Sequence, residues 1–83
     1  MQIIFSNHAK NQMVERDLSE DEIISTILRP DKIVPQSKGK FKAVKLIKKE
    51  NKKYLMVVIF CKVNSIKKVV TVFLTSKIKK YLI

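Results

Sequence analysis

The apolar positions of this chain recur at helical spacing in its first third and alternate as in strands after that. Gln2 to Phe5 is β-prone and short, which predicts an edge strand or a lead-in. Ser6 follows, and its hydroxyl suits the N-cap of a helix. Successive helical residues are about 100° apart, so a helix over residues 7–16 places Arg16 on the apolar side and His8 on the adjoining flank. We therefore expect Arg16 to face inward at the mouth of a cleft and His8 to border it.

A second helix is indicated over residues 20–29. Ser19 and Glu22 have the spacing of a capping box, in which each side chain satisfies a backbone amide at the start of a helix. Ile23 and the apolar residues that follow it at helical spacing predict an amphipathic helix that faces a core. Pro30 ends this helix, because the residue before a proline avoids the helical conformation.

The rest of the chain alternates apolar and polar residues with the repeat that is typical of strands. The expected strands are Lys32 to Val34, Phe41 to Lys49, Tyr54 to Val63 and Ile66 to Thr75, followed by a short helix over residues 77–82. The strand from Tyr54 is apolar on both faces, so we expect it in the centre of the sheet, covered on both sides. The predicted fold class is α+β, with two N-terminal helices packed on an antiparallel sheet of about four strands and a short C-terminal helix.

The 83 residues are expected to form a single domain, 1–83, whose net charge of +11 is unevenly distributed. Residues 1–31 carry three basic and six acidic side chains, whereas residues 32–83 carry fifteen basic and one acidic. A surface of that sign attracts polyanions, of which nucleic acid is the usual one, or an acidic protein. A membrane surface is less favoured, because the lysines lie among strand residues and not along one amphipathic helix. A lysine-rich composition that only aids solubility is the plain alternative.

Residue types that hold metals or form disulfides are scarce. One histidine, one cysteine and no cluster of acids supply no ligand set, so we expect no metal and no cofactor. Cys61 lies in an apolar run, which predicts a buried small hydrophobe in a reducing, cytoplasmic setting. No apolar run approaches the ~20 residues of a membrane span, and no secretion signal is recognisable. A chain this short buries only about 60% of its unfolded surface, so we also expect a protein partner or self-association.

Three segments together resemble a known family: FSNHAKNQMVERDLSEDEI, RPDKI and VVTVF. They are similar to the bacterial and archaeal family of domains of unknown function 4258, whose hallmark is a helix pair with HA and ER patterns followed by strands. That family is grouped with RelE-like and BrnT-like toxins. The resemblance therefore implies a RelE/barnase-like fold and a metal-independent ribonuclease that is the toxin of a toxin–antitoxin pair. Matched by position, the family's functional candidates fall on His8, Arg16 and Thr71.

The chain departs from the family pattern in two places. Asp17 stands where a glycine is common after the arginine. Leu74 stands where an arginine often follows the aromatic residue, which removes one expected phosphate contact. Lys77 lies three positions farther on and could supply the missing cation.

Metal-free RNA cleavage needs a proton-transfer group and cations. The 2′-hydroxyl attacks the phosphate, a base takes its proton and an acid protonates the leaving oxygen, each transfer contributing roughly 10²–10⁴-fold. Histidine gains and loses a proton near physiological pH, so His8 is the candidate acid or base. Arg16 has the planar fork that suits a phosphate, and Thr71 could hydrogen-bond a phosphate oxygen. The candidate RNA-binding residues are Lys45, Lys77, Lys80 and Tyr81.

Each candidate also has a structural interpretation. His8 could bond locally at the helix start, Arg16 could pair with a nearby glutamate, Thr71 could bond the backbone and Tyr81 could belong to the core. Two main functions stay open: a small metal-independent endoribonuclease, and a non-catalytic nucleic-acid-binding or protein-interaction module on the same scaffold. An orphan domain that has lost its partner and activity is the third. Convergence of the three catalytic candidates on a basic concave face would favour the enzyme, and a flat basic sheet would favour binding.

Overall fold

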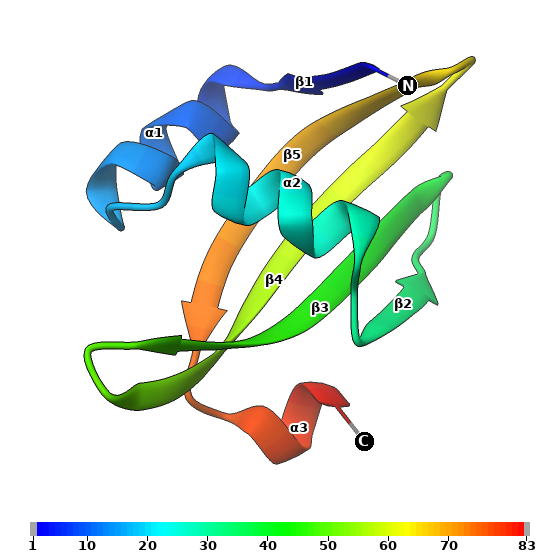
Figure 1. The fold of residues 1–83 in the computed structure, drawn as a ribbon. Coiled ribbons are helices and arrows are strands. Elements are labelled where there is room, and N and C mark those ends of the chain that lie inside the picture. Colours follow the sequence, from blue (N-terminus) through cyan, green and yellow to red (C-terminus); the bar gives the residue numbers. More distant parts are fainter. Residues whose placement is uncertain (1, 83) are drawn as a thin grey trace.

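The computed structural model describes residues 2–82 of the chain, and the side chains of residues 2–80. Within this range a five-stranded sheet carries three helices (Figure 1). In chain order the elements are β1 (Gln2–Phe5), α1 (Asn7–Glu15), α2 (Glu20–Leu28), β2 (Lys32–Pro35), β3 (Lys40–Lys49), β4 (Lys52–Val63), β5 (Ile66–Thr75) and α3 (Ile78–Leu82). The α+β class is confirmed, and the sequence-based boundaries differ from these by two residues at most.

The sheet is mixed, which corrects the expectation of an antiparallel sheet of about four strands. Its strand order is β1-β5-β4-β3-β2, and the strands from β2 to β5 form an antiparallel meander. β1 adds a fifth strand that runs parallel to β5, with Gln2 beside Ile66 and Phe5 beside Val69. This pairing joins segments from opposite ends of the chain. No local pattern in the sequence specifies such a pairing, because alternation predicts a strand but not its neighbour.

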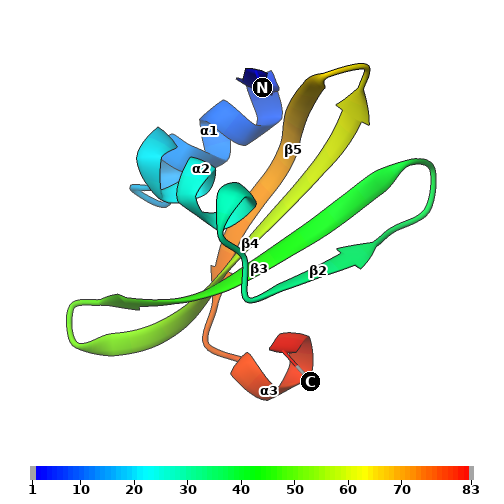
Figure 2. The ribbon, with the colours of Figure 1, turned by 45° about the vertical axis from the view of Figure 1, so that its right-hand side comes forward.

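The helices α1 and α2 pack on the same face of the sheet, and α3 lies apart from them (Figure 2). Ala9 of α1 and Ile23 of α2 are fully buried against strand residues that include Met56 and Phe60. Burial of a side chain as large as Ile23 stabilises the fold by roughly 1.5–3 kcal/mol. The core therefore sits between these two helices and the sheet.

The first helix ends in a Schellman turn, in which two amides bond back to the last helical carbonyls. The Leu18 amide donates to the Met13 carbonyl at 2.9 Å, and the Asp17 amide donates to the Val14 carbonyl at 3.4 Å. Asp17 has φ +53°, in the left-handed region that glycine adopts without steric cost. This backbone conformation explains why a glycine is common at the position of Asp17 in the family pattern.

The second helix begins as the sequence predicts. Ser19 Oγ accepts a hydrogen bond from the Glu22 amide at 3.2 Å, and Glu22 Oε1 accepts one from the Ser19 amide at 3.1 Å. Three acidic residues in the first turn lie at the positive end of the helix dipole. None of the helices within residues 2–82 is long and apolar enough to cross a bilayer.

Candidate nucleic-acid interface

One face of the sheet lies under α1 and α2, and these helices leave the other uncovered; we call the latter the open face. Val58 and Val72 belong to the core beneath the helices. Because successive strand residues point to opposite sides, their neighbours Ile59 and Thr71 lie on the open face. The same alternation and the strand register place six lysines there: Lys32, Lys40, Lys42, Lys48, Lys53 and Lys68.

Cross-strand neighbours arrange the open face in rows of mixed character. One row holds Lys40 and Lys68 on either side of β4, and both are exposed. The next row runs from Lys42 through Ile59 to Thr71, and all three are half-buried. Cations next to apolar surface suit a single-stranded nucleic acid, which offers both charged phosphates and flat bases.

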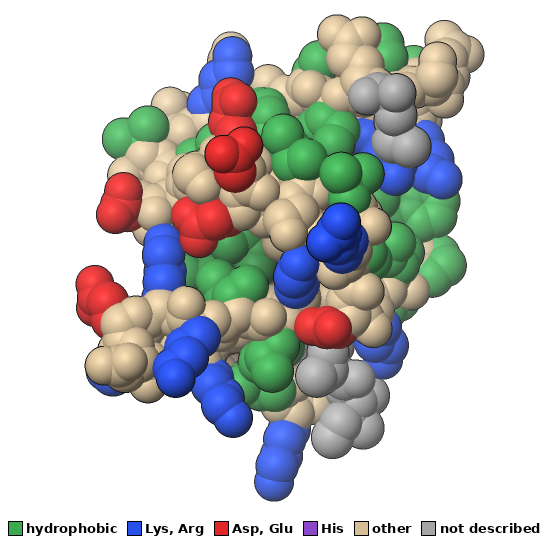
Figure 3. Space-filling view, in the orientation of Figure 1, with side chains coloured by type: hydrophobic (Ala, Val, Ile, Leu, Met, Phe, Trp, Pro, Cys, Tyr) green, Lys and Arg blue, Asp and Glu red, His purple; other side chains and the backbone are tan. Residues whose placement is uncertain are grey.

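Most acidic side chains lie on the helices and not on the strands. The strands contain eleven lysines and no acidic residue. Five of the seven acidic residues belong to α1, α2 and the link between them: Glu15, Asp17, Glu20, Asp21 and Glu22. Figure 3 shows acidic side chains gathered over these helices on the face in view. The acidic side chains are therefore concentrated on α1, α2 and their link, whereas the lysines of the open face have no acidic strand residue beside them, which gives that face a potential that attracts polyanions.

The third helix covers only part of the open face. Its Ile78 packs on Val44, Leu55 and Val57, which are fully buried, whereas Cys61 farther along β4 is half-buried. The prediction that β4 is covered on both faces is thus correct for its first half only. The prediction that Cys61 is buried is wrong. The reason is length, because a five-residue helix contacts only one end of a twelve-residue strand.

The first helix lies along the free edge of β5. β1 pairs with β5 only as far as Val69, and a β-bulge interrupts the β4–β5 ladder just beyond it. After the bulge, Gln12 Oε1 accepts a hydrogen bond from the Val72 amide at 2.9 Å and replaces the missing strand. The Ser6 amide donates to the Val69 carbonyl at 2.9 Å, so the chain from Ser6 to Gln12 follows the strand edge.

His8 lies on this segment, between Ser6 and Gln12, and its side chain is exposed. Thr71 lies on the open face of β5, one residue before Val72, whose amide bonds to Gln12. Two of the three catalytic candidates thus belong to neighbouring segments, α1 and the edge of β5.

Arg16 does not face inward, which corrects the helical-wheel expectation. The helix ends at Glu15, and Arg16 is its C-cap, with φ −105° and an exposed side chain. Helical periodicity no longer sets the direction of a residue beyond the last turn. Among the described residues, the side chains of His8, Arg16 and Thr71 form no hydrogen bond or ion pair, with each other or with any other residue.

The four predicted RNA-binding residues are dispersed. Lys45 lies on the helix-covered face, where its Nζ donates to Ser25 Oγ at 2.9 Å and ties β3 to α2. Lys77 is exposed just before α3, and Lys80 is exposed within α3. Tyr81 lies outside the residues whose side chains are described.

Sequence reasoning missed Lys40, Lys42 and Lys68 on the open face, and Gln12 at the edge of β5. The alternation within each strand was a usable signal for the three lysines. Each directly precedes a residue that faces the core, so its own side chain points to the opposite face. Gln12 had no comparable signal, since its partner amide is 60 residues away.

Within the part of the chain that the structure describes, no three His, Cys, Asp or Glu side chains come together as a possible metal site. Comparisons with curated proteins and with solved structures gave no match. The model of a family described as a domain of unknown function, DUF4258, matches residues 5–74, from the last residue of β1 to the next-to-last residue of β5. Because this match spans most of the chain, the protein belongs to the DUF4258 family.

Proposed function

We propose that the protein binds RNA through its open face. The observation that carries this proposal is the segregation of charge. Six strand lysines lie on that face, while five acidic residues lie on α1, α2 and their link. Half-buried apolar residues such as Ile59 lie between the lysines and offer a surface for unstacked bases. We propose the cytoplasm as the compartment in which the protein binds this RNA.

Salt dependence tests the electrostatic part of the proposal. Binding of a labelled single-stranded oligoribonucleotide is measured by fluorescence anisotropy over a range of KCl concentrations. Each phosphate contact should contribute about −0.7 to the slope of log affinity against log salt. An affinity that does not change with salt would rule out binding of this type.

A pair of charge-matched variants locates the interface. Lys40→Gln/Lys68→Gln removes two exposed cations from one row of the open face. Lys10→Gln/Lys52→Gln removes two exposed cations from α1 and the start of β4 on the other side. We expect the first double variant to bind RNA more weakly and with a slope shallower by about 1.4, and the second to stay close to the parent. Equal losses in both would show attraction by net charge without a defined interface.

A metal-independent endoribonuclease is the second candidate, and one observation favours it. Exposed His8 belongs to α1, which is anchored to β5 one residue from Thr71, and a proton-transfer group near this edge would meet the 2′-hydroxyl of RNA bound on the open face. Arg16 and Thr71 would then hold the phosphate. As such an enzyme, the protein would be a toxin of the RelE-like or BrnT-like kind. An antitoxin, or a second copy of the chain, would cover its basic face and keep it inactive.

Cleavage of RNA in excess chelator and growth arrest on expression test this second candidate. His8→Ala should lower the cleavage rate by roughly 10²–10⁴-fold and leave RNA affinity nearly unchanged. Asn11→Ala is the control, because Asn11 is exposed on the same helix. Cleavage by His8→Ala at the parent's rate would remove His8 from the mechanism. A parent that neither cleaves RNA nor arrests growth would leave the binding module as the function.

A further inference from the structure

The β4–β5 hairpin carries a second cationic site, on the face opposite to the open face. Lys62 and Lys67 are direct cross-strand partners on adjacent strands. Both belong to the helix-covered face, because each lies over a ring of Phe41 or Phe60, and Phe60 is part of the core beneath the helices. Two like charges placed opposite each other on one face repel and weaken a strand pair.

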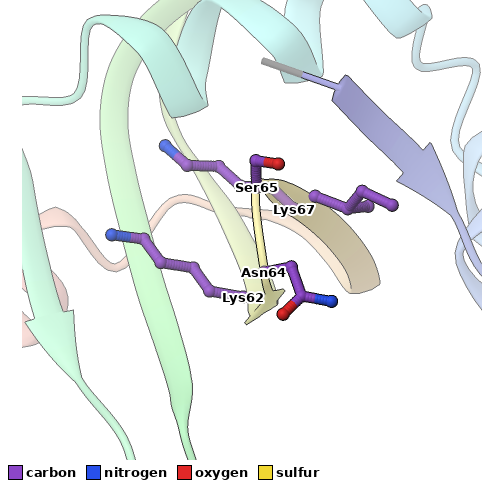
Figure 4. A pocket seen from close by; sticks show the side chains of 5 residues that line it. Lys62, Asn64, Ser65 and Lys67 are labelled. Carbon is purple, nitrogen blue, oxygen red and sulfur yellow. The ribbon is translucent and has the colours of Figure 1, made fainter.

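Both ammonium groups lie over aromatic rings. Lys62 Nζ lies 5.1 Å from the centroid of the Phe41 ring, and Lys67 Nζ lies 5.3 Å from that of Phe60. The two rings stack on each other with centroids 5.7 Å apart. In Figure 4 the two lysine side chains extend in the same direction from the hairpin. The two cations therefore lie over neighbouring rings, and each ring attracts its ammonium group.

Within residues 2–80, no acidic side chain pairs with either lysine. Among the described residues neither lysine has an ion pair with a carboxylate, in contrast to Lys49, which pairs with Glu22 at 3.6 Å. The lysines line a hollow of about 370 Å³ together with Asn64, Ser65 and Ile66 of the hairpin turn. The amide of Asn64 and the hydroxyl of Ser65 can each donate a hydrogen bond.

We propose that Lys62 and Lys67 form a phosphate-binding site at the β4–β5 hairpin. An anion shared by both ammonium groups would remove their repulsion and add two charge-assisted hydrogen bonds. A terminal phosphate suits the pair better than a phosphodiester, because it carries about −1.5 to −2 charges at pH 7, against one for the diester. Binding of inorganic phosphate at this site does not depend on the proposed RNA-binding function. Recognition of a phosphorylated RNA end at this site does rest on that proposed function.

The direct test is thermal unfolding of the parent protein in increasing inorganic phosphate, with potassium chloride added to keep the ionic strength constant. A ligand that binds only the folded state raises the midpoint continuously, by roughly 6–11 °C at ten times its dissociation constant. Amide chemical shifts in an NMR titration provide the second readout, and those of Asn64 and Ser65 should move saturably. A midpoint and shifts that respond to phosphate no more than to chloride would overturn the proposal.

Two double variants with the same loss of charge localise the site. Lys62→Gln/Lys67→Gln should fold with a stability close to the parent's, because relief of the repulsion offsets the loss of two lysine–ring contacts, and it should lose the phosphate response. Lys10→Gln/Lys52→Gln is the matched control, because these two exposed lysines lie on α1 and at the start of β4, away from both the β4–β5 hairpin turn and the open face. A response that persists in the first variant, or that disappears equally from both, would contradict the assignment.

An RNA arm separates this site from the open face. A 5′-phosphorylated oligoribonucleotide is compared with its 5′-hydroxyl counterpart, and only the parent and the Lys10→Gln/Lys52→Gln variant should prefer the phosphorylated one. Preference for the phosphorylated end in Lys62→Gln/Lys67→Gln would refute recognition of the end at this hairpin. Saturable binding of inorganic phosphate by a protein that binds neither oligonucleotide would overturn the RNA proposal and leave the phosphate site standing.

Discussion

Replacement of Gln12 by methionine tests whether one side-chain hydrogen bond holds α1 to the edge of β5. Methionine keeps the length and apolar stem of glutamine but has no strong acceptor, so the Val72 amide loses its partner at 2.9 Å. Val72 is fully buried, and an unpaired buried amide costs about 1–3 kcal/mol. For a domain of this size each kcal/mol lowers the melting temperature by about 4–8 °C. We therefore expect a decrease of roughly 4–24 °C.

Circular dichroism melting and urea unfolding measure this loss, and two variants control for it. Gln12→Glu retains a side-chain oxygen that can accept from the Val72 amide, so it should stay closer to the parent than Gln12→Met. Asn11→Met makes the same kind of change at an exposed neighbour and should alter stability by less than about 0.5 kcal/mol. A Gln12→Met protein that melts with the parent would show that the strand edge needs no such partner. Equal losses in Gln12→Glu and Gln12→Met would assign the effect to packing instead.

Three further substitutions have defined outcomes. Asp17→Gly should raise the free energy of unfolding by up to about 1 kcal/mol, because φ +53° disfavours a side chain, and a decrease in urea unfolding would contradict the Schellman-turn argument. Ser19→Ala should lower the free energy of unfolding by about 0.5–2 kcal/mol through loss of the capping box with Glu22. An unchanged urea midpoint would show that the cap is not needed. Thr71→Val keeps the β-branched shape, so it should leave the melting temperature nearly unchanged and weaken RNA binding by about tenfold. Parent-like affinity in that anisotropy measurement would exclude the Thr71 hydroxyl from the interface.

The sequence by itself determined the secondary structure and the identity of the core. Capping at Ser6 and Ser19, the helical spacing around Ile23 and the apolar run of β4 are local properties, and each involves residues a few positions apart. The backbone conformation responds to such neighbours directly, through caps and through side chains that repeat on one face. The excess of basic residues after residue 31 was equally visible, and it already indicated a polyanionic ligand.

Tertiary structure alone decided how the charges and the candidate residues are placed. The parallel pairing of β1 with β5 and the bond from Val72 to Gln12 join positions at least 60 residues apart, and together they anchor α1, which carries His8, along the edge of β5. The end of α1 at Glu15 turned Arg16 away from the position that the helical repeat predicts. Strand register set Lys62 against Lys67, because a shift of one residue would send each side chain to the opposite face. Long-range pairings of this kind depend on which strands meet, and a single sequence carries no local record of that choice.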